Sequence, residues 1–142
     1  MADPIVLTVE RYIAASPEKL FDAWLDAEAV GQWLFATPDG VMEKVEIDPR
    51  VGGKFRVEER RGDALARHWG EYIVLDRPRL IVFDFRTSED ERPTRVTAAI
   101  APAGDGSHIA LSHKLAPDWA DYEAQTRQGW TMIFEGLARM LS

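Results

Sequence analysis

The stretch Asp118–Leu141 reads DWADYEAQTRQGWTMIFEGLARML and decides the fold that we predict for this chain. Its large apolar side chains recur three and four residues apart, as on one face of a helix: Trp119, Tyr122, Trp130, Ile133, Phe134, Leu137, Met140 and Leu141. Pro117 and the capping carboxylate of Asp118 indicate where the helix begins. One face of this helix must be covered, and most of the preceding chain reads as strands. We therefore predict a curved antiparallel sheet wrapped around one long C-terminal helix.

Two glycines stand inside this predicted helix, where each costs about 1 kcal/mol relative to Ala. Gly129 and Gly136 are seven residues apart and so share a face. The interpretation that we favour is close approach of the helix to another backbone. The alternative is that they leave room for a bound molecule.

Length and composition limit the class of protein. With 142 residues and no cysteine, we expect one domain over residues 1–142, without disulfides, thiolate zinc sites or cysteine nucleophiles. No apolar run reaches the roughly 20 residues that span a bilayer, and the N-terminus lacks signal-peptide features, so we expect a cytoplasmic protein. The net charge of −7 argues against a nucleic-acid partner, because phosphate binding needs a basic surface.

The rest of the chain reads as strands around two short helices. Ile5–Ile13 is β-branched and alternating, which is typical of a strand. Ser16, followed by Pro17, and Asp26 each resemble the start of a short helix, the second of which reaches Trp33. Six further strands are predicted: Val41–Ile47, Lys54–Arg61, Arg67–Leu75, Leu80–Thr87, Thr94–Ala101 and Ser107–Leu115.

A set of short motifs runs along the chain in a fixed order. These are Ser16–Trp24 (SPEKLFDAW) with Asp26 and Trp33, Asp48-x-Arg50-x-Gly52-Gly53-x-Phe55, Gly70-Glu71-Tyr72 followed by Asp76-x-Pro78-x-Leu80, then His113, and Gly129-Trp130. Together they resemble the START-like (SRPBCC) superfamily, in the branch named after the C-terminal domain of the Hsp90 ATPase activator Aha1. The resemblance covers essentially the whole chain.

The resemblance implies an α+β helix-grip fold. In this fold a seven-stranded antiparallel sheet grips a long C-terminal helix, two short helices follow the first strand, and a cavity lies between sheet and helix. Superfamily members include lipid and hormone carriers, polyketide cyclases and aromatases, and the co-chaperone domain. The sequence has no counterpart of the separate N-terminal domain of the co-chaperones, so Hsp90 is a doubtful partner.

An apolar pocket with a few polar groups is the default site in such a fold. The candidate lining residues are Trp33, Phe35, Trp69, Tyr72, Phe83, Phe85, His113, Trp119, Trp130 and Phe134. Each alone fits ordinary core packing, but five tryptophans in 142 residues exceed what a core of this size needs. We therefore predict binding of a small hydrophobic or amphipathic molecule, without a cofactor.

Metal binding and catalysis receive less support from the spacing. His108 and His113 are five residues apart on one predicted strand, so they face opposite sides and cannot share a metal. His113 has the parity of the apolar positions and is a weak candidate for a base, with Glu71 or Asp84 to orient it. Arg11 shares the inward parity of its own strand. We assign no catalytic residue and predict no metal site.

Two other functions stay open. One is an enzyme of the polyketide cyclase or hydrolase kind that uses the same cavity without a metal. The other is a protein-interaction module of the co-chaperone type, whose working part is the surface of the sheet or helix. The open edges of the sheet would also allow a homodimer.

Overall fold

The computed structural model describes residues 5–37, 39–88, 92–115 and 117–141, without the side chain of Asp118. Its elements follow in the order β1 (Ile5–Ile13), α1 (Pro17–Ala23), α2 (Ala27–Trp33), β2 (Val41–Ile47), β3 (Lys54–Arg61), β4 (Ala64–Asp76), β5 (Leu80–Arg86), β6 (Thr94–Ala103), β7 (Gly106–Leu115), the 3-10 helix η1 (Pro117–Tyr122) and α3 (Glu123–Leu141). This is the predicted α+β helix-grip fold.

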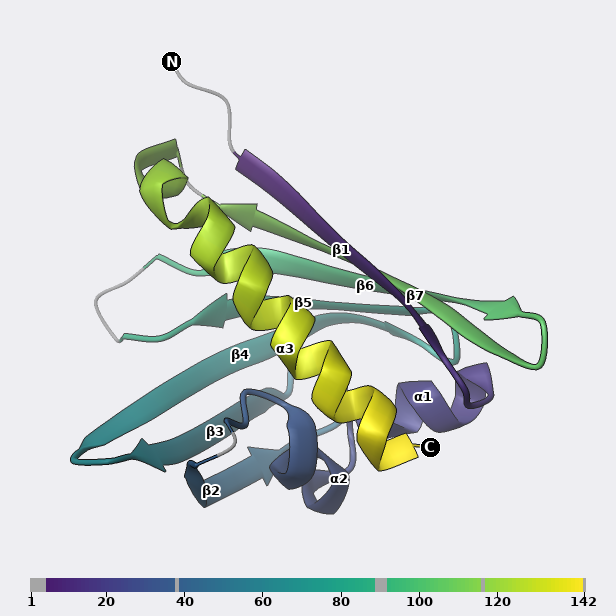
Figure 1. Ribbon diagram of the computed structural model, residues 1–142, viewed down its shortest axis with the longest axis horizontal. Coiled ribbons are helices and arrows are strands. Elements are labelled where there is room, and N and C mark those ends of the chain that lie inside the picture. Colours follow the sequence, from purple (N-terminus) through teal and green to yellow (C-terminus); the bar gives the residue numbers. More distant parts are fainter. Residues whose placement is uncertain (1–4, 38, 89–91, 116, 142) are drawn as a thin grey trace.

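Across the described residues, seven strands form one antiparallel sheet in the order β1-β7-β6-β5-β4-β3-β2. Each strand from β2 onward pairs with the next along the chain, and β1 joins the far side of β7. The twisted sheet lies behind α3, which crosses it diagonally (Figure 1). Side chains alternate between the face toward α3, which we call the inner face, and the opposite, outer face.

The two short helices begin where the sequence predicts. The Ser16 Oγ accepts a hydrogen bond of 3.2 Å from the Lys19 N–H, and Pro17 occupies the first turn. At α2 the Asp26 Oδ1 accepts a hydrogen bond of 3.3 Å from the Glu28 N–H. Both side chains satisfy backbone donors that the first helical turn leaves free.

The start of the C-terminal helix differs from the prediction. Pro117–Tyr122 forms a 3-10 helix, and the α-helix begins only at Glu123. Tight 3-10 turns are frequent at the ends of α-helices, and the apolar spacing of the sequence does not distinguish the two helix types over a single turn. The predicted capping side chain of Asp118 lies outside the described residues.

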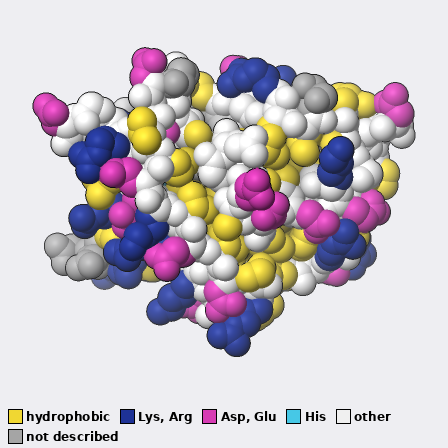
Figure 2. Space-filling model, turned by 90° about the horizontal axis from the view of Figure 1, so that it is seen from below, with side chains coloured by type: hydrophobic (Ala, Val, Ile, Leu, Met, Phe, Trp, Pro, Cys, Tyr) yellow, Lys and Arg dark blue, Asp and Glu magenta, His cyan; other side chains and the backbone are white. Residues whose placement is uncertain are grey.

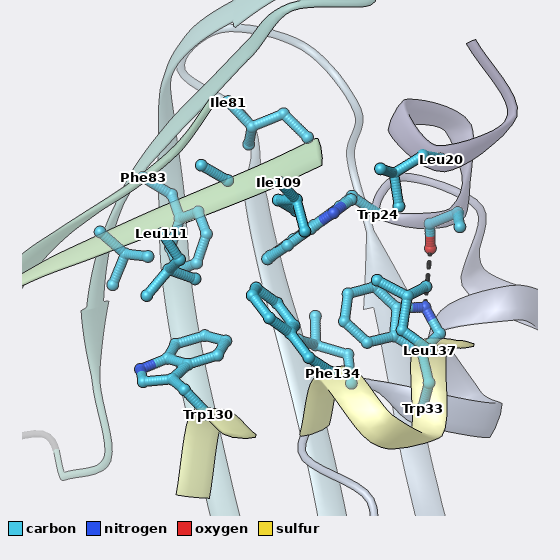
Figure 3. Close-up of a cluster of buried hydrophobic side chains, with 14 of the residues drawn as sticks. Leu20, Trp24, Trp33, Ile81, Phe83, Ile109, Leu111, Trp130, Phe134 and Leu137 are labelled. Carbon is cyan, nitrogen blue, oxygen red and sulfur yellow. Dashed lines mark hydrogen bonds between the residues drawn. The ribbon is translucent and has the colours of Figure 1, made fainter. Parts of the chain in front are cut away.

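The core fills the space between the inner face and the helices. Trp130, Phe134 and Leu137 of α3 point toward strand residues such as Phe83 and Leu111 (Figure 3). No helix in the described ranges is long and apolar enough to cross a membrane.

Candidate functional site

The structure gathers most of the predicted lining residues on the inner face. Seven of them are buried there: Trp33, Phe35, Tyr72, Phe83, His113, Trp130 and Phe134. Phe85 and Trp119 are half-buried and pack against the same core. Trp69 does not join them, because it alternates with His68 and Tyr72 along β4 and therefore lies on the outer face.

One half of this interior consists mainly of aromatic and aliphatic side chains. Trp24 is its centre, with its ring centroid 4.8 Å from that of Trp33 and 6.3 Å from that of Phe134. The Trp33 Nε1–H donates a hydrogen bond of 3.0 Å to the Ala23 carbonyl (Figure 3). The buried Nε1 of Trp24 has no hydrogen-bond acceptor among the described residues. We call this half the Trp24 core.

The other half centres on Phe35, which follows α2. The Phe35 ring stacks on His68 with centroids 4.1 Å apart and planes 1° from parallel. Its centroid also lies 5.1 Å from that of Phe85 and 5.7 Å from that of Trp130. These four residues, with His113 next to Phe85 and Trp130, form what we call the Phe35 cluster.

His113 is held by a complete chain of hydrogen bonds. The Trp130 Nε1–H donates to His113 Nδ1 at 3.1 Å, so Nδ1 is an acceptor and Nε2 carries the proton. His113 Nε2 then donates to Thr94 Oγ1 at 2.7 Å, and Thr94 donates to the Phe85 carbonyl at 3.3 Å. Burial lowers the pKa of His113 to about 4, so the ring is neutral near pH 7.

His68 is a second buried histidine of the cluster, and we predicted no role for it from the sequence. Its Nδ1 lies 3.2 Å from the Val57 carbonyl, which fixes the proton on Nδ1 and leaves Nε2 as an acceptor. Burial is the main cause that lowers the pKa of His68 to about 4. His68 and Tyr72 are four residues apart on β4, so both side chains face inward. The alternation along this strand could therefore have predicted the inward position of His68.

Phe35 has an unusual backbone conformation that neighbouring polar groups fix. Its φ angle is 59°, in the left-handed region that bulky residues rarely adopt. Glu59, only 1% exposed, accepts hydrogen bonds from the backbone N–H and the hydroxyl of Thr37 at 2.8 and 3.0 Å. Arg61 bonds Glu59 at 2.6 Å and donates to the Phe35 carbonyl at 3.0 Å. We call these contacts the Glu59 network.

The favoured interpretation of the two helix glycines is wrong. A Cβ at Gly129 would meet no atom within 4 Å. A Cβ at Gly136 would lie 3.9 Å from the Trp33 Cβ, an ordinary contact. Neither glycine therefore serves close approach of α3 to another backbone. In the sequence, Gly129 directly precedes Trp130 of the Phe35 cluster.

The polar partners suggested for His113 lie elsewhere. Glu71 and Asp84 alternate with Tyr72 and Phe83 along their strands, so they face outward and cannot orient His113. Asp84 instead pairs with Arg95 on the outer face. Arg11 has inward parity as predicted but is exposed, beside Glu135 and Arg139 of α3.

The predicted separation of His108 and His113 is confirmed. His108 lies on the outer face, 3.5 Å from Glu10, while His113 is buried on the inner face. Among the described residues, no group of three or more histidine, aspartate or glutamate side chains could hold a metal ion.

Comparison with known proteins identifies close relatives in fold. Residues 14–142 match the family described as activator of Hsp90 ATPase homolog 1-like protein. No curated protein matches the sequence. A crystal structure of a Chromobacterium violaceum protein is similar over 97% of this chain and 98% of its own, with 25% identity and a TM-score of 0.86.

Two further solved structures share the fold. A Rhodobacter sphaeroides protein aligns over 96% of this chain and 91% of its own, with 23% identity and a TM-score of 0.84. The AHSA1-like protein from Aeromonas hydrophila aligns over 95% of this chain and 90% of its own, with 21% identity and a TM-score of 0.82.

Proposed function

This chain belongs to the activator of Hsp90 ATPase homolog 1-like family, and from that premise we propose that it binds a small apolar or amphipathic molecule between the sheet and α3. The molecule takes the place of the Phe35 ring in the Phe35 cluster. The proposal concerns binding and not a reaction.

The strained backbone of Phe35 is the observation that carries this proposal. A bulky residue at φ 59° costs about 1 to 3 kcal/mol, and such strain gathers at ligand sites and switch regions. The Glu59 network holds the strained segment in place. When the segment moves, the strain is released and the faces of His68, Phe85 and Trp130 become available to a ligand.

Two polar groups of the interior are suited to orient the molecule. The Trp24 Nε1–H is a buried donor without an acceptor among the described residues, and leaving such a donor unbonded costs about 1 to 3 kcal/mol. His68 Nε2 is an acceptor on a neutral ring. A ligand with one carbonyl or hydroxyl group would satisfy one of them, and burial of its apolar surface would contribute roughly 25 cal/mol per Å².

A catalytic function has less support from this geometry. A base must have a lone pair that can reach a substrate proton. Both ring nitrogens of His113 already make hydrogen bonds, and its pKa of about 4 makes it a weak base. For His113 to act as a base, its hydrogen bonds with Trp130 and Thr94 would have to break first. Ligand binding requires only that Phe35 moves.

The test uses two variants that both remove the Phe35 ring. Phe35→Gly also removes the backbone strain, because glycine adopts positive φ freely, whereas Phe35→Ala retains it. Thermal-shift and native mass-spectrometry screens would use fatty acids, flavonoid-like and polyketide-like compounds. A ligand that binds only the folded state raises its melting temperature.

We expect at least one compound to bind the wild-type protein and to bind Phe35→Gly about tenfold more tightly. Met132→Ala, an exposed change on α3, is the control and should leave binding unchanged. If no compound binds the wild-type protein or either folded Phe35 variant, the proposal fails. The search would then move to protein partners of the sheet and helix surfaces.

A further inference from the structure

The outer face of the sheet carries a separate pocket of about 500 Å³, on the side that faces away from α3. Its outward side chains include Lys54, Arg56, Trp69, Glu71, Asp84 and Arg86. We propose that this pocket binds a small aromatic carboxylate. The outer pocket lies on the opposite face of the sheet from the Phe35 cluster. Phe85 belongs to that cluster and is also among the residues that line the pocket.

The strand register builds the floor of this pocket. Arg56 of β3 stands directly opposite Trp69 of β4, and Trp69 stands directly opposite Arg86 of β5. The guanidinium carbons of Arg56 and Arg86 lie 5.8 and 5.6 Å from the centroid of the indole ring. Both contacts are within the range of cation–π attraction. One aromatic surface is thus flanked by two guanidinium groups.

The hydrogen-bonding capacity of Arg56 is not used up by its ion pair. Its Nε lies 2.8 Å from the Glu58 carboxylate. The N–H is nevertheless not aimed at that oxygen, and this buried nitrogen has no hydrogen-bond acceptor among the described residues. Glu58 therefore holds the guanidinium by charge without satisfying its donors, of which arginine has five.

The charge around the pocket favours an anion. Two of its acidic residues are already paired with bases from outside it, Asp84 with Arg95 at 2.8 Å and Glu46 with Lys44 at 3.6 Å. The carboxylates of Asp84 and Glu46 are therefore already neutralised by bases that do not line the pocket.

The chemistry of these groups selects the ligand class. A guanidinium group binds a carboxylate through two parallel hydrogen bonds, and an indole ring stacks on a planar group. A volume of about 500 Å³ suits a small molecule and not a folded partner. The surface on the side of β2, next to this face, interleaves acidic and basic side chains with hydrophobic ones (Figure 2).

Amide and indole NMR titrations test the proposal with benzoate as the probe and neutral benzamide as the control. We expect benzoate to shift the amide signals of Gly70, Glu71 and Arg86 and the Trp69 indole signal in a saturable way. Benzamide should bind at least tenfold more weakly. Trp69→Phe identifies the indole signal and should weaken benzoate binding severalfold.

Two variants that each remove one positive charge distinguish a specific binding site from a general effect of charge. Arg56→Gln should weaken benzoate binding about tenfold, and Lys19→Gln, an exposed change on α1 with the same loss of charge, should change it less than twofold. Equal binding of benzamide, equal effects of the two variants, or no saturable shift would show that the Arg56–Trp69–Arg86 row only stabilises the sheet. Phe35→Gly should leave benzoate binding unchanged, so the two proposals can fail separately.

Discussion

The two halves of the interior contain similar aromatic rings but differ in the polar groups and the backbone strain around those rings. In the Trp24 core the rings contact one another edge to face, and the side chains of Trp33 and Phe134 are almost completely buried. In the Phe35 cluster the rings share the space with two neutral histidines, a buried carboxylate and a strained backbone. We therefore expect the Trp24 core to stabilise the fold. The buried polar groups and strained backbone of the Phe35 cluster lower stability. Function is therefore expected in the second half.

The largest expected effect of a single substitution tests the Trp24 core. Phe134→Ala removes a side chain with 0% exposure from the middle of α3. A cavity left by a deleted core aromatic typically costs about 3 to 5 kcal/mol, and we expect this loss in the free energy of unfolding. Denaturant titration measures it, with Met132→Ala on the same helix as the control. A loss below about 1 kcal/mol would mean that this half is not the stabilising one.

The next effect tests the buried histidines of the Phe35 cluster. The pKa of both His68 and His113 is lowered from 6.5 to about 4 in the folded protein, mainly by burial. Between these pH values the unfolded chain binds more protons than the folded one. The stability is therefore complete above pH 6.5 and falls toward pH 4, by about 3 kcal/mol for each histidine.

Unfolding free energies measured from pH 7 to pH 4 check this expectation. His113→Gln should flatten the decline by about half, because one of the two histidines no longer titrates. His108→Gln, at an exposed position on the outer face, should leave the decline unchanged. An equally steep decline in His113→Gln would show that the carboxylates and not the buried histidines dominate acid unfolding.

Sequence reasoning found the elements because their signals are local. The strand patterns, the caps Ser16 and Asp26 and the inward parity of His113 each depend on residues close in the chain. The error at Trp69 was avoidable. The parity argument that separated His108 from His113 also separates Trp69 from Tyr72, three residues later on one strand.

The Phe35 cluster itself was not predictable in the same way. The stacking of Phe35 on His68 depends on a loop conformation with φ 59° and on a carboxylate 22 residues from the threonine that it binds. No periodicity encodes such a conformation. The inward position of Glu59 could have been inferred from Phe55 and Val57 on the same strand, but its partners in the loop could not.

A smaller effect tests the Glu59 network. A Cβ at Gly40 would overlap the Glu59 carboxyl group and lie 2.6 Å from the Thr37 hydroxyl. We expect Gly40→Ala to break the bonds between Glu59 and Thr37 and to cost about 1 to 3 kcal/mol. Hydrogen exchange at the Thr37 amide should accelerate more than exchange in the Trp24 core.

The matched control is Gly31→Ala in α2. Its added Cβ would lie at an ordinary 3.6 Å from Val45, so the change should be neutral or stabilising. If Gly40→Ala leaves the Thr37 amide as protected as in the wild-type protein, the Glu59 network does not hold Phe35.

The smallest effect has the opposite sign and tests the two glycines of α3. Gly129→Ala adds a Cβ that meets nothing within 4 Å, so it should stabilise the protein by about 0.5 to 1 kcal/mol through helix propensity. Gly136→Ala should give a similar gain, because its Cβ would make only ordinary contacts, with Arg139 and Trp33. Thermal or denaturant unfolding measures both gains.

The two glycines differ in what a larger side chain would do to ligand binding. If the open space at Gly129 belongs to the ligand site, Gly129→Leu should weaken the binding of any compound found for the Phe35 cluster at least tenfold while the protein stays folded. Gly136→Ala should leave that binding unchanged, because Gly136 lies against Trp33 in the other half of the interior. If Gly129→Leu folds and binds as well as the wild-type protein, the space beside Gly129 is open surface and the ligand enters elsewhere.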